Sequence, residues 1–111
     1  MKSSFVDYVV NDLLNGVEGI RAKAMFGGHG LYKGNIFFGI IVDDELYYKA
    51  DQSTQKDFKA FGSEPFRYSR KDKKAVTMSY WKLPAQIMDE RQDLLTWTEK
   101  AVRVAALSKK D

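Results

Sequence analysis

Residues 22–49 read AKAMFGGHGLYKGNIFFGIIVDDELYYK, and this stretch decides the fold. Residues 36–42 are rich in β-branched and aromatic side chains, which favour a central strand. Short turn signals flank it, at residues 33–35 and at Asp43-Asp44. Glycines interrupt residues 22–32, and we interpret them as a bulge or bend inside one strand. The pattern predicts a three-stranded antiparallel meander over residues 22–32, 36–42 and 45–49.

Helical and strand patterns flank this meander. Before it, apolar side chains follow the spacing of one helix face: Phe5, Tyr8, Val9 and Leu13. After it, two helices and two strands are predicted, over residues 51–61 and 89–107 and over residues 65–68 and 75–81 respectively. The order is α-β(3)-α-β(2)-α. Because no helix alternates with single strands, we expect an α+β domain over residues 1–111, an antiparallel sheet flanked by helices.

Composition narrows the class of protein. Of 111 residues, 44% are hydrophobic and 30% are charged, as in an ordinary globular domain. There is no cysteine, which excludes disulfides and thiolate chemistry and fits a cytoplasmic location. No apolar run is long enough to span a membrane, since residues 36–42 are only strand-sized.

The sequence offers no recognisable catalytic or cofactor-binding pattern. His29 is the only histidine, and no acid, base or nucleophile is near it in sequence to orient it. The spacing of Gly28, Gly30 and Gly34 is not a dinucleotide-binding fingerprint, because a strand rather than a helix follows. We therefore expect a protein without catalytic residues, cofactor or metal, in which Gly27, Gly28 and Gly30 serve the backbone.

The basic segment of residues 67–74 is the sharpest functional candidate. Residues 67–111 carry 11 basic and 6 acidic side chains, against 7 and 9 in residues 1–66. The cations of the segment could bind phosphates or an acidic partner: Arg67, Arg70, Lys71, Lys73 and Lys74. The other interpretation is a solvated turn whose lysines protect a sheet edge from pairing. We expect the nearby aromatic residues to pack the sheet against its helices: Phe66, Tyr68, Tyr80 and Trp81.

Several segments together resemble the amino-terminal domain of the TfoX/Sxy family. The most specific is Met25-Phe26-Gly27-Gly28-His29-Gly30, and it lies within the longer similar stretch of residues 21–32. Residues 34–39, 46–49, 61–66 and 78–84 are also similar. The resemblance covers nearly the whole chain. It implies an α-β(3)-α-β(2)-α fold related to secretion-chaperone-like folds, with Met25, Phe26, Gly27, Gly28 and Gly30 as structural motif residues.

The resemblance also implies a regulatory rather than an enzymatic role. The family is associated with natural competence and transformation in bacteria, where it acts with a cyclic-AMP receptor protein in transcription regulation. Full-length members usually carry a carboxy-terminal helical domain, which we do not expect in a chain ending at Asp111. We expect a regulatory module with a protein partner, and a homodimer is consistent with this fold type. Two alternatives stay open: direct nucleic-acid binding through residues 67–74, and an uncharacterised small-ligand protein with a pocket near residues 27–30.

Overall fold

The computed structural model describes residues 4–25, 28–68 and 76–108. In chain order the elements are α1 (Ser4–Asp7), the π-helix η1 (Tyr8–Leu13), β1 (Ile20–Met25), β2 (Gly28–Lys33), β3 (Ile36–Val42), β4 (Glu45–Lys49), α2 (Gln52–Ala60), β5 (Pro65–Tyr68), β6 (Val76–Lys82), α3 (Ala85–Met88) and α4 (Arg91–Ser108).

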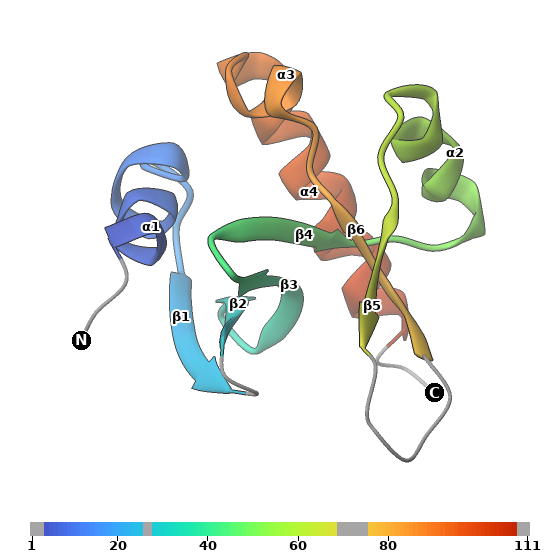
Figure 1. Cartoon of the computed structure of the whole chain (residues 1–111). Helices are drawn as coiled ribbons and strands as arrows, with labels where there is room; N and C mark the ends of the chain where they lie inside the picture. Colours follow the sequence, from blue (N-terminus) through green and yellow to red (C-terminus); the bar gives the residue numbers. More distant parts are fainter. Residues whose placement is uncertain (1–3, 26–27, 69–75, 109–111) are drawn as a thin grey trace.

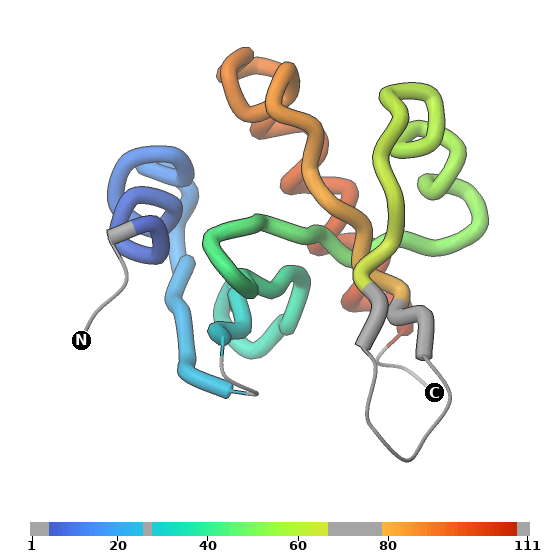
Figure 2. Tube along the Cα trace, in the orientation of Figure 1, coloured from blue at the N-terminus to red at the C-terminus, as the bar shows by residue number. Residues whose placement is uncertain are grey.

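Six strands of the described residues form one antiparallel sheet, in the order β1-β2-β3-β4-β6-β5. Helix α4 lies behind β4 and β6, with α1 and η1 on one side of it and α2 on the other (Figure 1). The tube in Figure 2 follows the sheet as it curves from β1 to the β5–β6 pair. The predicted α+β class, with an antiparallel sheet flanked by helices, is confirmed.

The predicted first strand, residues 22–32, is instead two strands. β1 and β2 pair antiparallel from Ile20 with Lys33 to Met25 with Gly28, so the chain reverses between Met25 and Gly28. The glycines that we interpreted as a bulge in one strand accompany this reversal. The meander therefore has four strands rather than three, and β1 is an edge strand of the sheet.

A bulge does occur, one hairpin later, between β2 and β3. Leu31 pairs with Gly39 while Tyr32 pairs with Phe37, so Phe38 is the extra residue. Phe37 keeps its pairing with Tyr32, and Phe38 points to the opposite face of the strand. Phe38 is fully buried in the core, and Phe37 stacks on Tyr32 with ring centres 5.1 Å apart. At the next turn, Asp43 and Asp44 both have positive φ, as a tight two-residue hairpin requires.

The first helix departs from the expected apolar face. Only its first turn is α-helical, and the wider π-helix η1 ends with the Leu14 amide donating to the Val9 carbonyl oxygen at 2.9 Å. Val9 and Leu13 are buried as predicted, but Tyr8 is 46% exposed. The reason is the winding: a π-helix takes more residues per turn than the 3.6 that the prediction assumed.

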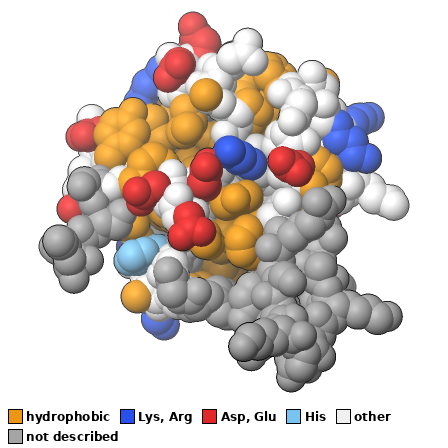
Figure 3. All heavy atoms as spheres, in the orientation of Figure 1, with side chains coloured by type: hydrophobic (Ala, Val, Ile, Leu, Met, Phe, Trp, Pro, Cys, Tyr) orange, Lys and Arg blue, Asp and Glu red, His pale blue; other side chains and the backbone are white. Residues whose placement is uncertain are grey.

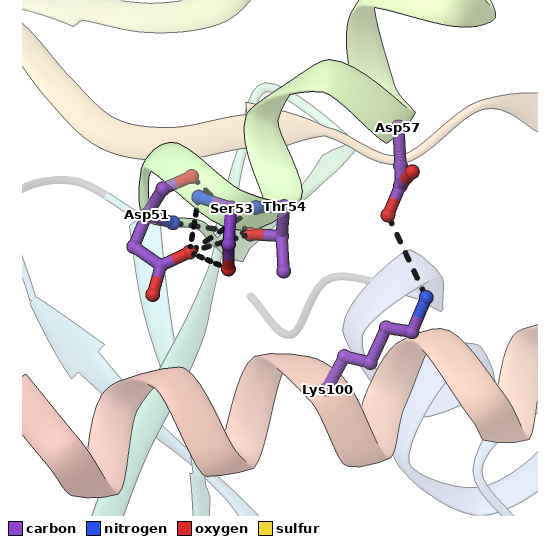
Figure 4. A network of polar contacts seen from close by, with 5 residues as sticks. All are labelled: Asp51, Ser53, Thr54, Asp57 and Lys100. Carbon is purple, nitrogen blue, oxygen red and sulfur yellow. Dashed lines mark hydrogen bonds and ion pairs between the residues drawn. The ribbon is translucent and has the colours of Figure 1, made fainter.

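Helix α2 begins at a capping box and is fastened to α4 by an ion pair (Figure 4). The Asp51 carboxylate accepts hydrogen bonds from the amides of Ser53 and Thr54, so Asp51 is the N-cap of α2. Asp57 pairs with Lys100 of α4 at 3.5 Å. The capping box defines where α2 begins, and the ion pair joins α2 to the middle of α4.

Helix α4 covers the core face of the sheet. Its buried side chains are Leu94, Thr98, Ala101, Val104 and Ala105. It begins at Arg91, later than the predicted residue 89, because the short helix α3 precedes it. Among the described residues, none of the helices has the length and apolarity that crossing a membrane demands.

Candidate functional site

A groove of about 550 Å³ runs along the side of α4 that faces the turn after η1. We call it the α4 groove, and its lining residues are Gly16, Val17, Lys33, Arg91, Leu95, Thr98, Glu99, Val102 and Arg103. The α4 members recur every three or four residues, so they share one helix face. The opposite wall comes from the Gly16–Val17 turn and from the end of β2.

Arg91 holds the two walls of the α4 groove together. Its Nη1 donates to the Leu13 carbonyl oxygen at 3.0 Å, and its Nη2 donates to the Asn15 carbonyl oxygen. These carbonyls lie at the C-terminal end of η1, where helices leave acceptors unsatisfied. A cation at this end also interacts favourably with the negative end of the helix dipole. Sequence reasoning missed this role because Arg91 bonds residues 76 and 78 positions away.

Thr98, one of the lining residues of the α4 groove, forms a buried hydroxyl pair with Tyr48. The Tyr48 and Thr98 oxygens lie 2.7 Å apart, and Thr98 Oγ1 also donates to the Leu94 carbonyl oxygen at 2.7 Å. Since a carbonyl can only accept, the Tyr48 hydroxyl donates to Thr98. Burial raises the pKa of the Tyr48 hydroxyl far above its ordinary value. The pair therefore remains neutral and joins α4 to β4.

The groove mixes apolar and charged side chains. Val17, Leu95 and Val102 supply apolar surface between the walls. Three cations surround them, Lys33, Arg91 and Arg103, with Glu99 as the single carboxylate of the lining. This composition suits a protein segment better than a small apolar ligand, because interfaces combine an apolar centre with a polar rim.

The glycines of the family motif lie where neighbouring atoms leave little room for a side chain. A Cβ on Gly28 would overlap the carbonyl oxygen of Ile41 on β3. A Cβ on Gly30 would lie 2.9 Å from the Phe37 ring and 3.0 Å from the Met25 methyl group. Close strand packing thus needs glycine at Gly28, where the contact is with backbone, whereas a larger residue at Gly30 would require the Phe37 and Met25 side chains to shift. Phe26 and Gly27 lie outside the described residues.

His29 lines a separate hollow of about 350 Å³ between the first helix and β1. Its other polar lining residues are Asp7, Asn11 and Arg21. This is where the sequence hypothesis of a small-ligand pocket near residues 27–30 falls. Among the described residues, no group of three acidic or histidine side chains is placed to hold a metal ion.

Most of the basic segment lies outside the described residues: Arg70, Lys71, Lys73 and Lys74. Arg67 belongs to β5, where its backbone pairs with Thr77 of β6. The described part of the face in Figure 3 carries acidic side chains interspersed with hydrophobic ones, rather than a continuous basic stripe. Direct nucleic-acid binding through residues 67–74 therefore stays a sequence hypothesis.

From the sequence we expected these aromatic residues to pack the sheet against its helices, and their contacts in the structure differ from one residue to the next. Trp81 does, with its ring centre 6.1 Å from that of Phe58 on α2. Tyr80, its neighbour in β6, points to the other face and lies 5.6 Å from Phe37. Phe66 contacts Tyr47 at 5.1 Å. Tyr80 also lines a hollow with Ala105 and Ser108 of α4, so it lies between the sheet and that helix as well as beside Phe37.

On the face of the sheet that carries Tyr80, three aromatic rings lie in a row with a cation at each end. The row consists of Arg21, Tyr32, Phe37, Tyr80 and Lys49, with successive separations of 5.0, 5.1, 5.6 and 5.1 Å between charges and ring centres. Each ring has a neighbour or a cation beside it, so the row stabilises the sheet through aromatic and cation–π contacts.

Comparison with known proteins bears on the identity of the chain. No curated protein matches it significantly. The TfoX N-terminal domain profile matches residues 12–105, which include β1 to β6, α2, α3 and most of α4. All the lining residues of the α4 groove fall within that match. The chain belongs to the TfoX N-terminal domain family.

Proposed function

We propose that this TfoX N-terminal domain is a non-enzymatic, regulatory protein-interaction module that binds its partner in the α4 groove. The observation that carries the proposal is the groove itself. Arg91 fixes its two walls through carbonyl hydrogen bonds, and its lining combines apolar side chains with a charged rim. A wall held in place before binding lowers the ordering cost of association.

The family supplies the direction of the proposal. The sequence resemblance to TfoX/Sxy regulators points to transcriptional machinery, such as a cyclic-AMP receptor protein, as the partner. On this proposal the chain acts in the cytoplasm and alters transcript levels through a protein contact. Direct nucleic-acid binding would instead require cations arranged along one surface.

A matched pair of substitutions on α4 tests the proposal. Leu95→Ser removes apolar surface inside the groove, whereas Leu107→Ser does so outside it, where Leu107 is 59% exposed. Each tagged variant is expressed in native cells that lack the chromosomal copy. Proteins are co-purified with and without nuclease, and transcripts are sequenced.

We expect wild type and Leu107→Ser to retain a nuclease-resistant protein partner and the same transcript profile. Leu95→Ser should lose both while folding normally by circular dichroism. The proposal fails if deletion of the chain leaves transcripts unchanged and no protein co-purifies. It also fails if nuclease removes every bound component, since the partner would then be nucleic acid.

A further inference from the structure

We infer that the partner segment in the α4 groove is an acidic amphipathic helix. This inference rests on the proposed function, since it names the chemistry of the partner for the same groove. Three properties of the lining support it: the length of the groove, the line of apolar side chains along it, and the excess of positive charge at its rim.

The length suits one short helix. The groove residues of α4 run from Arg91 to Arg103, which is about 18 Å at 1.5 Å per helical residue. A partner helix of about 12 to 14 residues covers this distance. Helices that bind in grooves do so through apolar side chains on one face, spaced every three or four residues.

The apolar side chains are placed to receive such a face. Leu95 and Val102 lie two turns apart on the same line of α4, and Val17 faces them from the opposite wall. Val102 also packs partly against the core, so it is held in position, while Leu95 stays half-buried. An apolar stripe on the partner helix would cover all three.

The charges favour an acidic partner. Lys33, Arg91 and Arg103 line the groove against the single carboxylate of Glu99. The described residues contain ion pairs at Lys82 and Lys100, but none at Lys33 or Arg103. These two cations are therefore available to a partner's carboxylates. Complementary charge of this kind raises the association rate and selects between partners.

Glu99 adds a constraint on register. It lies one turn after Leu95 and one turn before Arg103 on the same face of α4. A partner carboxylate facing Arg103 is attracted, but one facing Glu99 is repelled. The partner helix should thus be acidic along its flanks except at the position opposite Glu99.

Two synthetic peptides of about 14 residues test the inference by fluorescence polarisation with the full chain. Both have leucines at helical i, i+3 and i+7 spacing, and they differ only in carrying glutamates or lysines at the flanking positions. We expect the acidic peptide to bind, with an affinity that falls as salt rises. The lysine peptide should bind at least about tenfold more weakly, or ~1.4 kcal/mol.

Charge reversal in the chain locates the binding. The double variant Lys33→Glu/Arg103→Glu should weaken binding of the acidic peptide by at least about tenfold, because each change replaces an attraction by a repulsion. Lys56→Glu is the matched control, since Lys56 is an exposed cation of α2 outside the groove. It should change binding by less than about twofold.

Three results with the peptides would overturn the inference: equal binding of both peptides, binding of neither peptide, and an equal loss of binding with Lys56→Glu. A labelled DNA duplex serves as a further probe, and binding of DNA but of neither peptide through Lys33 and Arg103 also overturns it. If native cells still yield a partner that Leu95→Ser loses, the proposed function survives any of these failures.

Discussion

The hydroxyl pair of Tyr48 and Thr98 allows a quantitative test of how α4 is joined to the sheet. Tyr48 is 0% exposed and Thr98 is 2% exposed, so neither oxygen can exchange its partner for bulk water. Replacing Tyr48 by Phe removes one donor but leaves Thr98 Oγ1 donating to the Leu94 carbonyl oxygen. We expect a loss of ~1 kcal/mol in the free energy of unfolding.

Thr98→Val should cost more than Tyr48→Phe. It leaves the buried Tyr48 hydroxyl without an acceptor, which costs about 1 to 3 kcal/mol. In the double variant no hydroxyl of the pair remains, so the cost of the orphaned donor disappears. The double variant should therefore be more stable than the sum of the two single losses predicts, by about 1 kcal/mol.

Urea unfolding of wild type, both single variants and the double variant measures this coupling. The midpoints should shift at constant m, because the surface exposed on unfolding barely changes. Circular dichroism at 222 nm follows the helices and Trp fluorescence follows the core. If the single losses add to the double loss within ~0.3 kcal/mol, the hydrogen bond from Tyr48 to Thr98 makes no specific contribution and the reasoning is refuted.

Three further perturbations have expected outcomes. Burial and the nearby Tyr32 hydroxyl raise the pKa of Tyr80 from 10.0 to about 12, so its contribution to stability is complete below pH 10 and is lost as pH rises through 12. Tyr80→Phe should make alkaline unfolding less steep, by up to ~1.4 kcal/mol per pH unit, and an unchanged slope would contradict this. Gly28→Ala should cost about 1 to 3 kcal/mol in thermal unfolding, because its methyl group would meet the Ile41 carbonyl oxygen; a neutral result would show that β2 and β3 can separate freely. Asp51→Ala should cost ~1 kcal/mol by loss of the α2 cap, whereas Asp51→Asn should keep most of that stability, and equal losses would argue against capping.

Local chemistry made much of the fold predictable. Residues 36–42 and 45–49 formed the expected strands because runs of β-branched and aromatic residues are separated by clear turn signals. Asp51 capped α2 because its side chain can reach the first free amides. The class of the fold and the antiparallel pairing followed from the order of these elements.

The errors arose where a residue pattern permits two backbone paths. Glycines fit both a bulge and a strand reversal, so residues 22–32 did not reveal two strands. Phe37 and Phe38 have the same strand propensity, and only the pairing of Tyr32 with Phe37 and of Leu31 with Gly39 shows that Phe38 is the bulged residue. The π-helix at Tyr8–Leu13 shifted an apolar pattern that was predicted with α-helical spacing.

The α4 groove was beyond sequence reasoning for a different reason. Its walls come from the turn after η1, the end of β2 and one face of α4, which only the fold brings together. Arg91 looks like an ordinary surface cation until its contacts with Leu13 and Asn15 are known. The motif glycines were recognisable in sequence, but their role is packing between strands.

Backbone amide chemical shifts test the central claim most directly. The ¹⁵N-labelled chain is titrated with the acidic amphipathic peptide, and shift changes are mapped onto the residues. Binding in the α4 groove predicts the largest changes at Val17, Lys33, Leu95 and Val102, and little change at Lys56. Changes concentrated at His29 or along β5 and β6, with the groove amides unmoved, would contradict it.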